Sequence, residues 1–197
     1  MRKSIVILGG KSDIGLSIAK KFHSKNFDII LACREIEDNL EFKNEIKNLF
    51  GNNCSIIEFN ILDISSHTSF LEKVFLQVSK FKNTEYLENQ ISPDIVVNVI
   101  GKMTSTIKDK NDLKLYEEAM LSNYLCPVLL IESLVEKIRK TTTKCSIIGI
   151  SSVAGERGRA SNYIYGSAKS GFTEYLSGLR QRLHGTNILI QTINHTK

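Results

Sequence analysis

The chain has 197 residues, of which 42% are hydrophobic and 24% are charged, and its formal net charge is +5 at pH 7. This is the composition of an ordinary globular protein with a real core. The lysines are scattered rather than gathered in a basic run with aromatic residues, which argues against nucleic-acid binding. No apolar run approaches the roughly 18 residues of a membrane span, so we expect no integral membrane segment.

The four cysteines are Cys33, Cys54, Cys126 and Cys145, and no two form a Cys-x-x-Cys pair. Two fall in predicted strands and one in a predicted helix. This placement favours buried free thiols in a reducing cytosol over disulfides or a bound metal. The start, Met-Arg-Lys-Ser, leads into a strand too short for a signal region. We expect one cytoplasmic domain over residues 1–197, and peripheral contact with a membrane stays open.

Short apolar runs alternate with helical patterns along the chain. The predicted strands are Ile5–Leu8, Asp28–Cys33, Ser55–Asn60, Ile95–Val99, Ser146–Ile150 and Ile188–Ile193. The predicted helices are a pattern that runs through Phe22, then Glu37–Phe50, Ser69–Lys80, Leu113–Arg139 and Ile164–Leu183. Residues 82–92 are a predicted surface loop. The alternation predicts an α/β fold with a doubly wound parallel sheet (a Rossmann fold) in three α/β/α layers.

A glycine-containing turn follows the first strand. It reads Gly9-Gly10-Lys11-Ser12-Asp13-Ile14-Gly15 and opens the first helix. Free backbone N–H groups and the helix dipole favour a phosphate at such a turn, although a plain strand-to-helix turn is the alternative. We expect Asp13 to cap the helix and to face away from a bound pyrophosphate.

The second strand ends in Arg34 and Glu35. An acid at this point of a Rossmann site binds the ribose 2′-OH of NAD, whereas an arginine suits the 2′-phosphate of NADP. Arg34, assisted by Lys11, therefore favours NADPH, and an ordinary loop arginine is the alternative. Because Glu35 is one residue from the acidic position, NAD stays possible.

The stretch between the fifth strand and the last helix carries the candidate chemistry. The helix is expected to begin near Ser161 or Asn162, since either is a good N-cap. Tyr165 and Lys169 are four residues apart and share one helix face. The lysine, with the charge of a bound cofactor, can lower the pKa of a phenol from its usual value of about 10. Ser152, at the carboxyl end of the strand, can hold a substrate oxygen beside it.

This stretch resembles the active-site signature of the short-chain dehydrogenase/reductases, in which the second serine lies thirteen residues before the tyrosine, as Ser152 and Tyr165 do. The amino-acid sequence of this stretch also resembles that of a bacterial subgroup that reduces keto-sugars carried on polyprenyl phosphate in cell-envelope glycan synthesis. The resemblance implies an NAD(P)H-dependent reduction of a carbonyl. Tyr165 would donate the proton, Ser152 would hold the carbonyl oxygen, and Lys169 would bind the nicotinamide ribose.

Further motifs match the family in part. Gly9 and Gly15 correspond to the first and last glycines of Thr-Gly-x-x-x-Gly-x-Gly, with Leu8 and Asp13 at the threonine and the middle glycine. Asp63-Ile64 resembles the acidic-aliphatic pair that contacts adenine, with a loop leading to a helix cap as the alternative. The cofactor set implied is Gly9, Lys11, Ser12, Asp13, Ile14, Gly15, Arg34, Asp63, Ile64, Asn98, Gly101, Tyr165 and Lys169.

Two motifs concern the middle of the chain. Asn98-Val99-Ile100-Gly101 resembles the family's Asn-Asn-Ala-Gly, which supports the central strand and the ribose side of the cofactor. Asn123 matches the asparagine whose helix holds a water linked to the active-site lysine. Pro127 has no N–H for the Asn123 carbonyl, which is thereby left free for that water. The alternative is a kinked packing helix.

The end of the chain departs from the family pattern. His195-Thr196 stands where relatives have Pro-Gly, followed by a substrate-covering segment and a seventh strand. We therefore expect an incomplete C-terminus, weak NADPH binding, poor turnover and an open edge at the sixth strand that invites association. A catalytically silent cofactor-binding or assembly protein is the alternative function. Family members pair the helices at 113–139 and 163–183 between subunits, which implies a homodimer or homotetramer.

Overall fold

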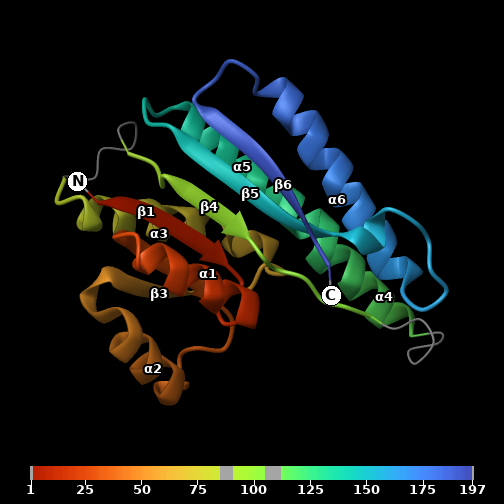
Figure 1. Cartoon of the computed structure of the whole chain (residues 1–197), viewed down its shortest axis with the longest axis horizontal. Coiled ribbons are helices and arrows are strands. Elements are labelled where there is room, and N and C mark those ends of the chain that lie inside the picture. The colour runs from red at the N-terminus through yellow and green to blue at the C-terminus, as the bar shows by residue number, and fades with distance from the viewer. Residues whose placement is uncertain (1, 85–90, 105–111, 197) are drawn as a thin grey trace.

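The computed structural model describes residues 2–84, 91–104 and 112–196, and its strands form a six-stranded parallel sheet (Figure 1). The strand order is β3-β2-β1-β4-β5-β6, so the chain reverses direction across the sheet between β1 and β4. The strands are β1 (Lys3–Leu8), β2 (Phe27–Cys33), β3 (Cys54–Glu58), β4 (Ile95–Asn98), β5 (Cys145–Ser152) and β6 (Ile188–His195). The predicted doubly wound sheet is confirmed. Most of the loop predicted at 82–92 lies outside the described residues.

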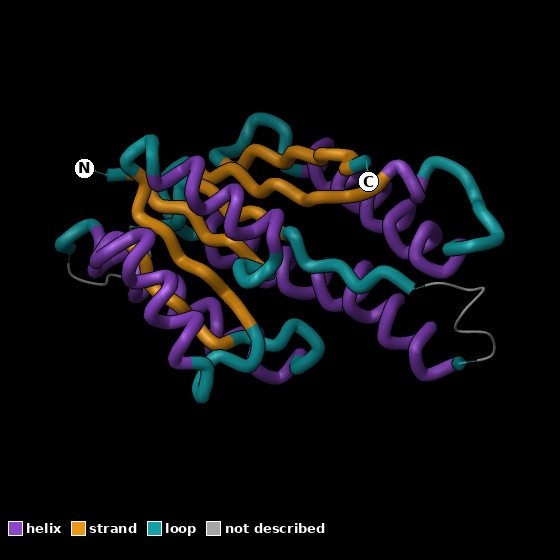
Figure 2. The backbone as a smooth tube through the Cα atoms, turned by 60° about the horizontal axis from the view of Figure 1, so that its bottom comes forward, coloured by secondary structure: helices purple, strands orange, loops and turns teal. Residues whose placement is uncertain are grey.

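Helices cover both faces of the sheet (Figures 1 and 2). They are α1 (Asp13–His23), α2 (Leu40–Phe50), α3 (His67–Phe81), α4 (Leu113–Met120), α5 (Cys126–Arg139) and α6 (Tyr163–Arg182). One buried cluster joins the sheet to α1 and α2, and a second joins it to α3, α5 and α6. The three predicted layers are therefore present.

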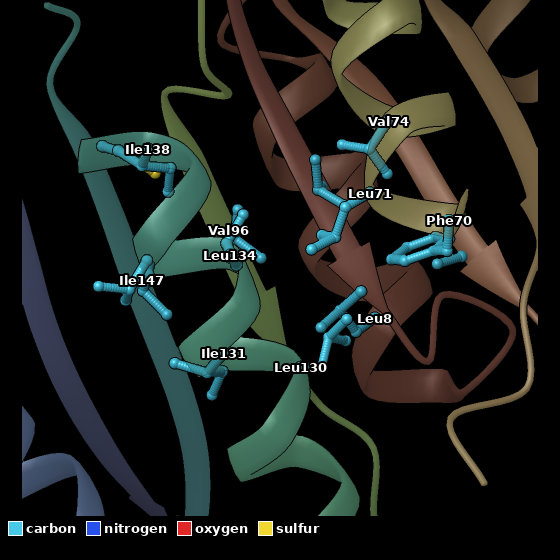
Figure 3. Close-up of a cluster of buried hydrophobic side chains, with 14 of the residues drawn as sticks. Leu8, Phe70, Leu71, Val74, Val96, Leu130, Ile131, Leu134, Ile138 and Ile147 are labelled. Carbon is cyan, nitrogen blue, oxygen red and sulfur yellow. The ribbon is translucent and has the colours of Figure 1, made fainter. Parts of the chain in front are cut away.

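The larger cluster holds the centre of the molecule together (Figure 3). Leu130 and Leu134 of α5 lie against Leu8 and Val96 at the middle of the sheet, and Phe70 of α3 packs nearby. Each such side chain contributes about 1.5–3 kcal/mol when it is fully buried. This packing fixes the carboxyl ends of β1 and β4, where the candidate site lies.

The helix boundaries differ from the prediction where side chains cap the backbone. α2 begins at Leu40 rather than Glu37, because the Asn39 side chain accepts a hydrogen bond from the Phe42 N–H (3.0 Å) and sets the start. The helix predicted over 113–139 is divided by a π-helical turn, Leu121–Leu125. This turn directly precedes Pro127, whose missing N–H disturbs the α-helical hydrogen-bond pattern.

Among the described residues, the helical stretch Leu113–Arg139 is long enough to cross a membrane and contains an 18-residue window with a mean hydropathy of 1.3. Half of it is buried inside the protein, and its buried side chains belong to the core on the α3–α5–α6 face. A core helix passes the same test of length and composition, so the finding is a weak indication of a membrane span.

All four cysteines are free thiols, as the sequence predicts. Burial raises the pKa of Cys33 to about 11 and the pKa of both Cys54 and Cys145 to about 12. These three thiols therefore stay protonated and unreactive at neutral pH.

The outer edge of the sheet at β6 is partly closed by a side chain. The Cys145 N–H donates to the Asn187 carbonyl, so the Asn187 carbonyl points toward β5. Backbone groups of successive residues in a strand point to opposite sides, so the Ile190 carbonyl, three residues later, points to the outer edge. Arg180 of α6 donates its Nε–H to that carbonyl and a second N–H to the Thr192 hydroxyl, each at 2.9 Å. The expectation of an edge at β6 is confirmed, but the expectation that its backbone groups are unpaired is wrong at Ile190.

Candidate active site

The turn between β1 and α1 is shaped by Gly9 and Ser12. Gly9 has a φ of +88°, in the left-handed region, and an added Cβ would meet the Val99 side chain at 3.1 Å. Ser12 caps α1, since its hydroxyl accepts from the Gly15 N–H (3.1 Å) and donates to the Gly9 carbonyl (2.8 Å). The N-terminus of α1 therefore meets the carboxyl edge of the sheet, where it favours an anion.

The prediction that Asp13 caps this helix is wrong. Asp13 is the first residue of α1, whereas the residue before it, Ser12, has the extended backbone that a cap requires. Asp13 is exposed and lies outside the cavity described next. Its carboxylate therefore does not line the space beside the glycine turn, in keeping with the expectation that it faces away.

A cavity of about 480 Å³ opens at the carboxyl ends of β1, β2 and β4, the point where the strand order reverses. Ligands of open α/β sheets bind at such a switch point. Its lining comprises Gly9, Lys11, Ser12, Ala32, Cys33, Arg34, Glu35, Phe59, Asn60, Ile61, Leu62, Val99, Ile100, Gly101, Lys102, Glu118 and Ser122. Five predicted cofactor residues are among them: Gly9, Lys11, Ser12, Arg34 and Gly101.

The other predicted residues of the cofactor set lie outside this lining. Asp13, Ile14, Gly15, Asp63, Ile64, Asn98, Tyr165 and Lys169 do not reach the cavity surface. Gly15 supports the turn from behind, because a Cβ there would meet the Gly9 carbonyl at 2.6 Å. Asn98 is buried below the cavity, where its Oδ1 accepts from the Ile100 N–H, and its Nδ2 has no hydrogen-bond partner within the described chain.

Asp63 and Ile64 lie outside the cavity lining, and their predicted contact with adenine stays a prediction. β3 ends at Glu58, so the chain passes the cavity at Asn60 and Ile61 and has turned outward by Asp63. A hydrogen bond from the Ser65 hydroxyl lowers the pKa of the exposed Asp63 carboxyl. The four residues that follow the strand, Phe59, Asn60, Ile61 and Leu62, line the cavity, and their place after the strand is the sequence signal for them.

Gly101 joins the cavity to the candidate catalytic residues. A Cβ added at Gly101 would meet Asn123 Oδ1 at 3.0 Å and Lys169 Nζ at 3.3 Å. The Asn123 amide is buried in the π turn, where its Nδ2 donates to the carbonyls of Ala119 and Lys102 (both 2.8 Å) and its Oδ1 accepts from the Lys102 N–H (3.1 Å). Asn123 thus fixes the loop that follows β4.

Lys169 is 3% exposed, and its ammonium is held by backbone carbonyls. Nζ donates to the Ile150 carbonyl at 3.1 Å and to the Ile100 carbonyl at 3.4 Å, and it lies 5.9 Å from the centre of the Tyr165 ring. Burial lowers the pKa of Lys169 to about 8. At neutral pH the side chain keeps its charge but releases its proton far more readily than an exposed lysine.

Tyr165 is buried beside Ser152. Burial raises the pKa of Tyr165, and a hydrogen bond with the Ser152 hydroxyl opposes that shift. The expected lowering of this pKa by Lys169 is therefore not produced by the protein alone, because burial outweighs the neighbouring groups and the ammonium is directed at two carbonyls. Any lowering has to come with a bound ligand.

Close backbone contact fixes Ser152 relative to Tyr165. Ser152 caps a short 3-10 turn, Val153–Gly155, by accepting from the Ala154 N–H (3.2 Å). A Cβ at Gly166 would meet the Ala154 carbonyl at 2.5 Å, so α6 packs directly on this turn. Asn162 occupies the N-cap position of α6 as predicted, but its side chain makes no capping bond.

A doubly wound parallel sheet with a glycine turn and three cationic side chains at its switch point defines the class of Rossmann-type nucleotide-binding proteins. Within that class, the short chain dehydrogenase family model matches residues 3–196. The chain belongs to this family of oxidoreductases.

Curated relatives include oxidoreductases. An uncharacterized oxidoreductase of Mycobacterium tuberculosis is 26% identical over 184 residues, which are 93% of this chain and 68% of the relative. The 3-oxoacyl-[acyl-carrier-protein] reductase FabG of Chlamydia muridarum is 26% identical over 198 residues, which are 98% of this chain and 73% of the relative. The relatives are thus longer than the chain described here.

Solved structures share the fold. ElxO with NADP bound has a TM-score of 0.81 and 21% sequence identity, with 98% of this chain and 73% of that chain covered. A 3-oxoacyl-[acyl-carrier protein] reductase from Brucella melitensis in complex with NAD has a TM-score of 0.79 and 20% identity, with the same two coverages. Structural neighbours therefore include proteins that bind NADP and proteins that bind NAD.

Proposed function

We propose that this chain is a cytoplasmic reductase that transfers hydride from NADPH to a ketone carbonyl. The observation that carries the proposal is the group of half-buried Ser152 with buried Tyr165 and Lys169, which Gly101 connects to a cavity at the switch point. The three side chains have the roles that the family resemblance implies. The resemblance of the Ser151–Lys169 stretch to the keto-sugar reductase subgroup favours a keto-sugar of envelope glycan synthesis as the substrate.

The residues present fit a phosphorylated dinucleotide. The glycine turn leaves space for a pyrophosphate at the N-terminus of α1, because side chains at Gly9 or Gly15 would fill it or distort it. Arg34 and Lys11 supply positive charge for a 2′-phosphate, and Asn60 and Ile61 form the adenine wall in place of Asp63 and Ile64. The cofactor, when bound, supplies the hydride.

The side chains then manage the proton. Ser152 holds the carbonyl oxygen, and Tyr165 gives its hydroxyl proton to that oxygen as the hydride arrives at carbon. Lys169, whose pKa is lowered to about 8 by burial, holds the nicotinamide ribose and stabilises the phenolate that results. A water at the Asn123 carbonyl returns the proton. Such acid catalysis typically contributes about 10²–10⁴-fold in rate.

A second candidate is a cofactor-binding protein without turnover. Burial raises the pKa of Tyr165 in the protein alone, and the silent protein is the case in which a bound cofactor does not lower it. The test is the loss of NADPH absorbance with a panel of ketones, with cofactor binding followed by fluorescence. Turnover supports the reductase, whereas binding without turnover on any ketone supports the silent protein.

Arg34→Ala is expected to weaken NADPH binding about ten- to a hundredfold and to leave NADH binding much less affected. A charge-assisted hydrogen bond to the 2′-phosphate contributes roughly 1.5–3 kcal/mol, and NADH has no such group. Fluorescence titration with both cofactors measures the difference, and Lys25→Ala, just beyond the C-terminal end of α1, is the control. Equal losses for the two cofactors would rule out the 2′-phosphate role.

We also propose that α4, α5 and α6 pair between subunits. Large apolar side chains on this helical layer are exposed, with Met120 at 37%, Leu125 at 41% and Leu129 at 37%. A helix that is apolar on a second face needs a second packing partner. The wild type should sediment as a dimer or tetramer at micromolar concentration, and Leu125→Glu with Leu129→Glu should shift it to the monomer. A monomeric wild type contradicts the proposal.

A further inference from the structure

One ion pair lines the cavity but has no part in the proposed reaction. Lys102 Nζ lies 2.7 Å from Glu118 Oε2, and the side chains are 41% and 36% exposed. Both residues belong to the cavity lining. Pairs with this exposure contribute little to stability, so folding alone does not account for two opposite charges at this place.

The backbone of Lys102 is held firmly although its ammonium is accessible. The Asn123 amide bonds both the N–H and the carbonyl of Lys102, and Lys102 directly follows Gly101, where Asn123 and Lys169 meet. Lys102 follows β4, which lies next to β5 and therefore on the side of Ser152. The remaining cations of the cavity, Lys11 and Arg34, follow β1 and β2 on the other side.

The pair can exchange one partner for another at little cost. Glu118 extends from α4 and presents a carboxylate to an ammonium whose own loop is fixed. A carboxylate or phosphate oxygen on a ligand has the same chemistry as Glu118 and can replace it, and the freed Glu118 turns to solvent. A neutral hydroxyl cannot compete with Glu118 in this way.

From this arrangement we infer that Lys102 selects ketones that carry an anionic oxygen group, and that Glu118 holds its ammonium until such a substrate enters. The inference rests on the proposed function, because it names the substrate class of the same site. It makes Lys102 a specificity residue, separate from the residues that move the hydride and the proton.

Removal of the Lys102 charge and removal of the Glu118 charge should change the preference for ionised over neutral ketones in opposite directions. Lys102→Met keeps the apolar stem and should lower the ratio of kcat/KM for an ionised ketone to that for its neutral counterpart by about tenfold or more. Glu118→Gln keeps the shape and frees the ammonium, so it should raise that ratio several-fold. Two pairs of ionised and neutral ketones are compared: a 2-keto acid with its primary amide, and a hydroxyketone phosphate with the unphosphorylated hydroxyketone. The first pair tests recognition of a carboxylate, and the second tests recognition of a phosphate.

Matched controls are Lys114→Met and Glu117→Gln, which remove the same charges from exposed positions of α4 outside the cavity lining. Neither should change the ratio. A purely structural ion pair would make Lys102→Met and Glu118→Gln shift the ratio in the same direction, and this result overturns the inference. If Lys102→Met lost NADPH affinity by as large a factor as the kcat/KM ratio, Lys102 would be assigned to a cofactor phosphate, and this result would also overturn the inference.

Calorimetry separates this inference from the proposed function. If the wild type turns over no ketone, the reductase proposal fails, and binding of the keto acid and its amide to the NADPH-loaded chain still decides the role of Lys102. The keto acid should bind more tightly to Glu118→Gln than to the wild type, and least to Lys102→Met. Binding that is the same in all three proteins, or absent from all three, overturns the inference.

Discussion

Tyr165→Phe is expected to lower kcat by about 10²–10⁴-fold and to leave NADPH affinity nearly unchanged. The hydroxyl is the only group removed, and it is the only buried acid placed beside Ser152 in the described site. Phenylalanine keeps the ring that packs near Lys169. The fall should therefore appear in the chemical step, measured as single-turnover NADPH oxidation, with little change in the cofactor titration.

Tyr163→Phe is the matched control for this change. Tyr163 lies two residues earlier on α6, carries the same hydroxyl and is 48% exposed. Its loss should leave kcat close to that of the wild type. A Tyr165→Phe enzyme that turns over within tenfold of the wild type would remove Tyr165 as the acid, whatever the control shows.

Lys169→Met should abolish turnover and at the same time make the protein more stable at pH 7. The ordinary pKa of lysine is 10.5, and burial lowers that of Lys169 to about 8. The folded state therefore holds this charge at a cost of about 3 kcal/mol, at 1.36 kcal/mol for each pKa unit. Methionine removes the cost but also removes two hydrogen bonds to carbonyls, each worth about 1 kcal/mol, so a net gain of about 1–2 kcal/mol is expected.

The pH dependence of stability gives an independent check. Below pH 8 both the folded and the unfolded state hold the Lys169 proton, and the destabilisation is fully present. Between pH 8 and 10.5 the unfolded state binds more protons, so the Lys169 contribution to wild-type stability rises with pH until the cost is gone. Denaturant unfolding should show the stability advantage of Lys169→Met falling over this range and passing to the wild type, because the charge cost of about 3 kcal/mol exceeds the net gain at pH 7. An advantage that stays constant or grows would contradict the buried charge.

Local sequence signals were sufficient for most of the fold. Each of the six strands is a short apolar run bounded by turn residues, and the ends of these runs lie within two residues of the ends of the observed strands. The start of α2 differs because one side chain, Asn39, caps the helix, and a hydrophobic pattern does not register a cap of this kind. The π turn before Pro127 likewise depends on backbone bonding that residue type alone does not specify.

The candidate site was predictable where spacing along one element decides it. Ser152, Tyr165 and Lys169 come together because a strand end and a helix face fix their separation. Asp63 lies outside the cavity lining, because β3 ends at Glu58, two residues before the predicted end of the strand, and the chain has turned outward by Asp63. Lys102 and Glu118 carry no local signal, since their approach depends on how α4 packs beside the loop after β4.

The hydrogen bond from Arg180 to the Ile190 carbonyl occupies a backbone acceptor at the outer edge of β6. The eight residues of β6 include no proline, lysine, arginine or acid, a composition that readily recruits another strand. An incoming strand must displace the guanidinium before it can pair with the middle of β6. Addition of a strand therefore replaces the Arg180 hydrogen bond to the Ile190 carbonyl with a backbone hydrogen bond. Arg180 belongs to α6, the helix that also carries Tyr165 and Lys169, so a strand that displaces its guanidinium changes a contact of that same helix.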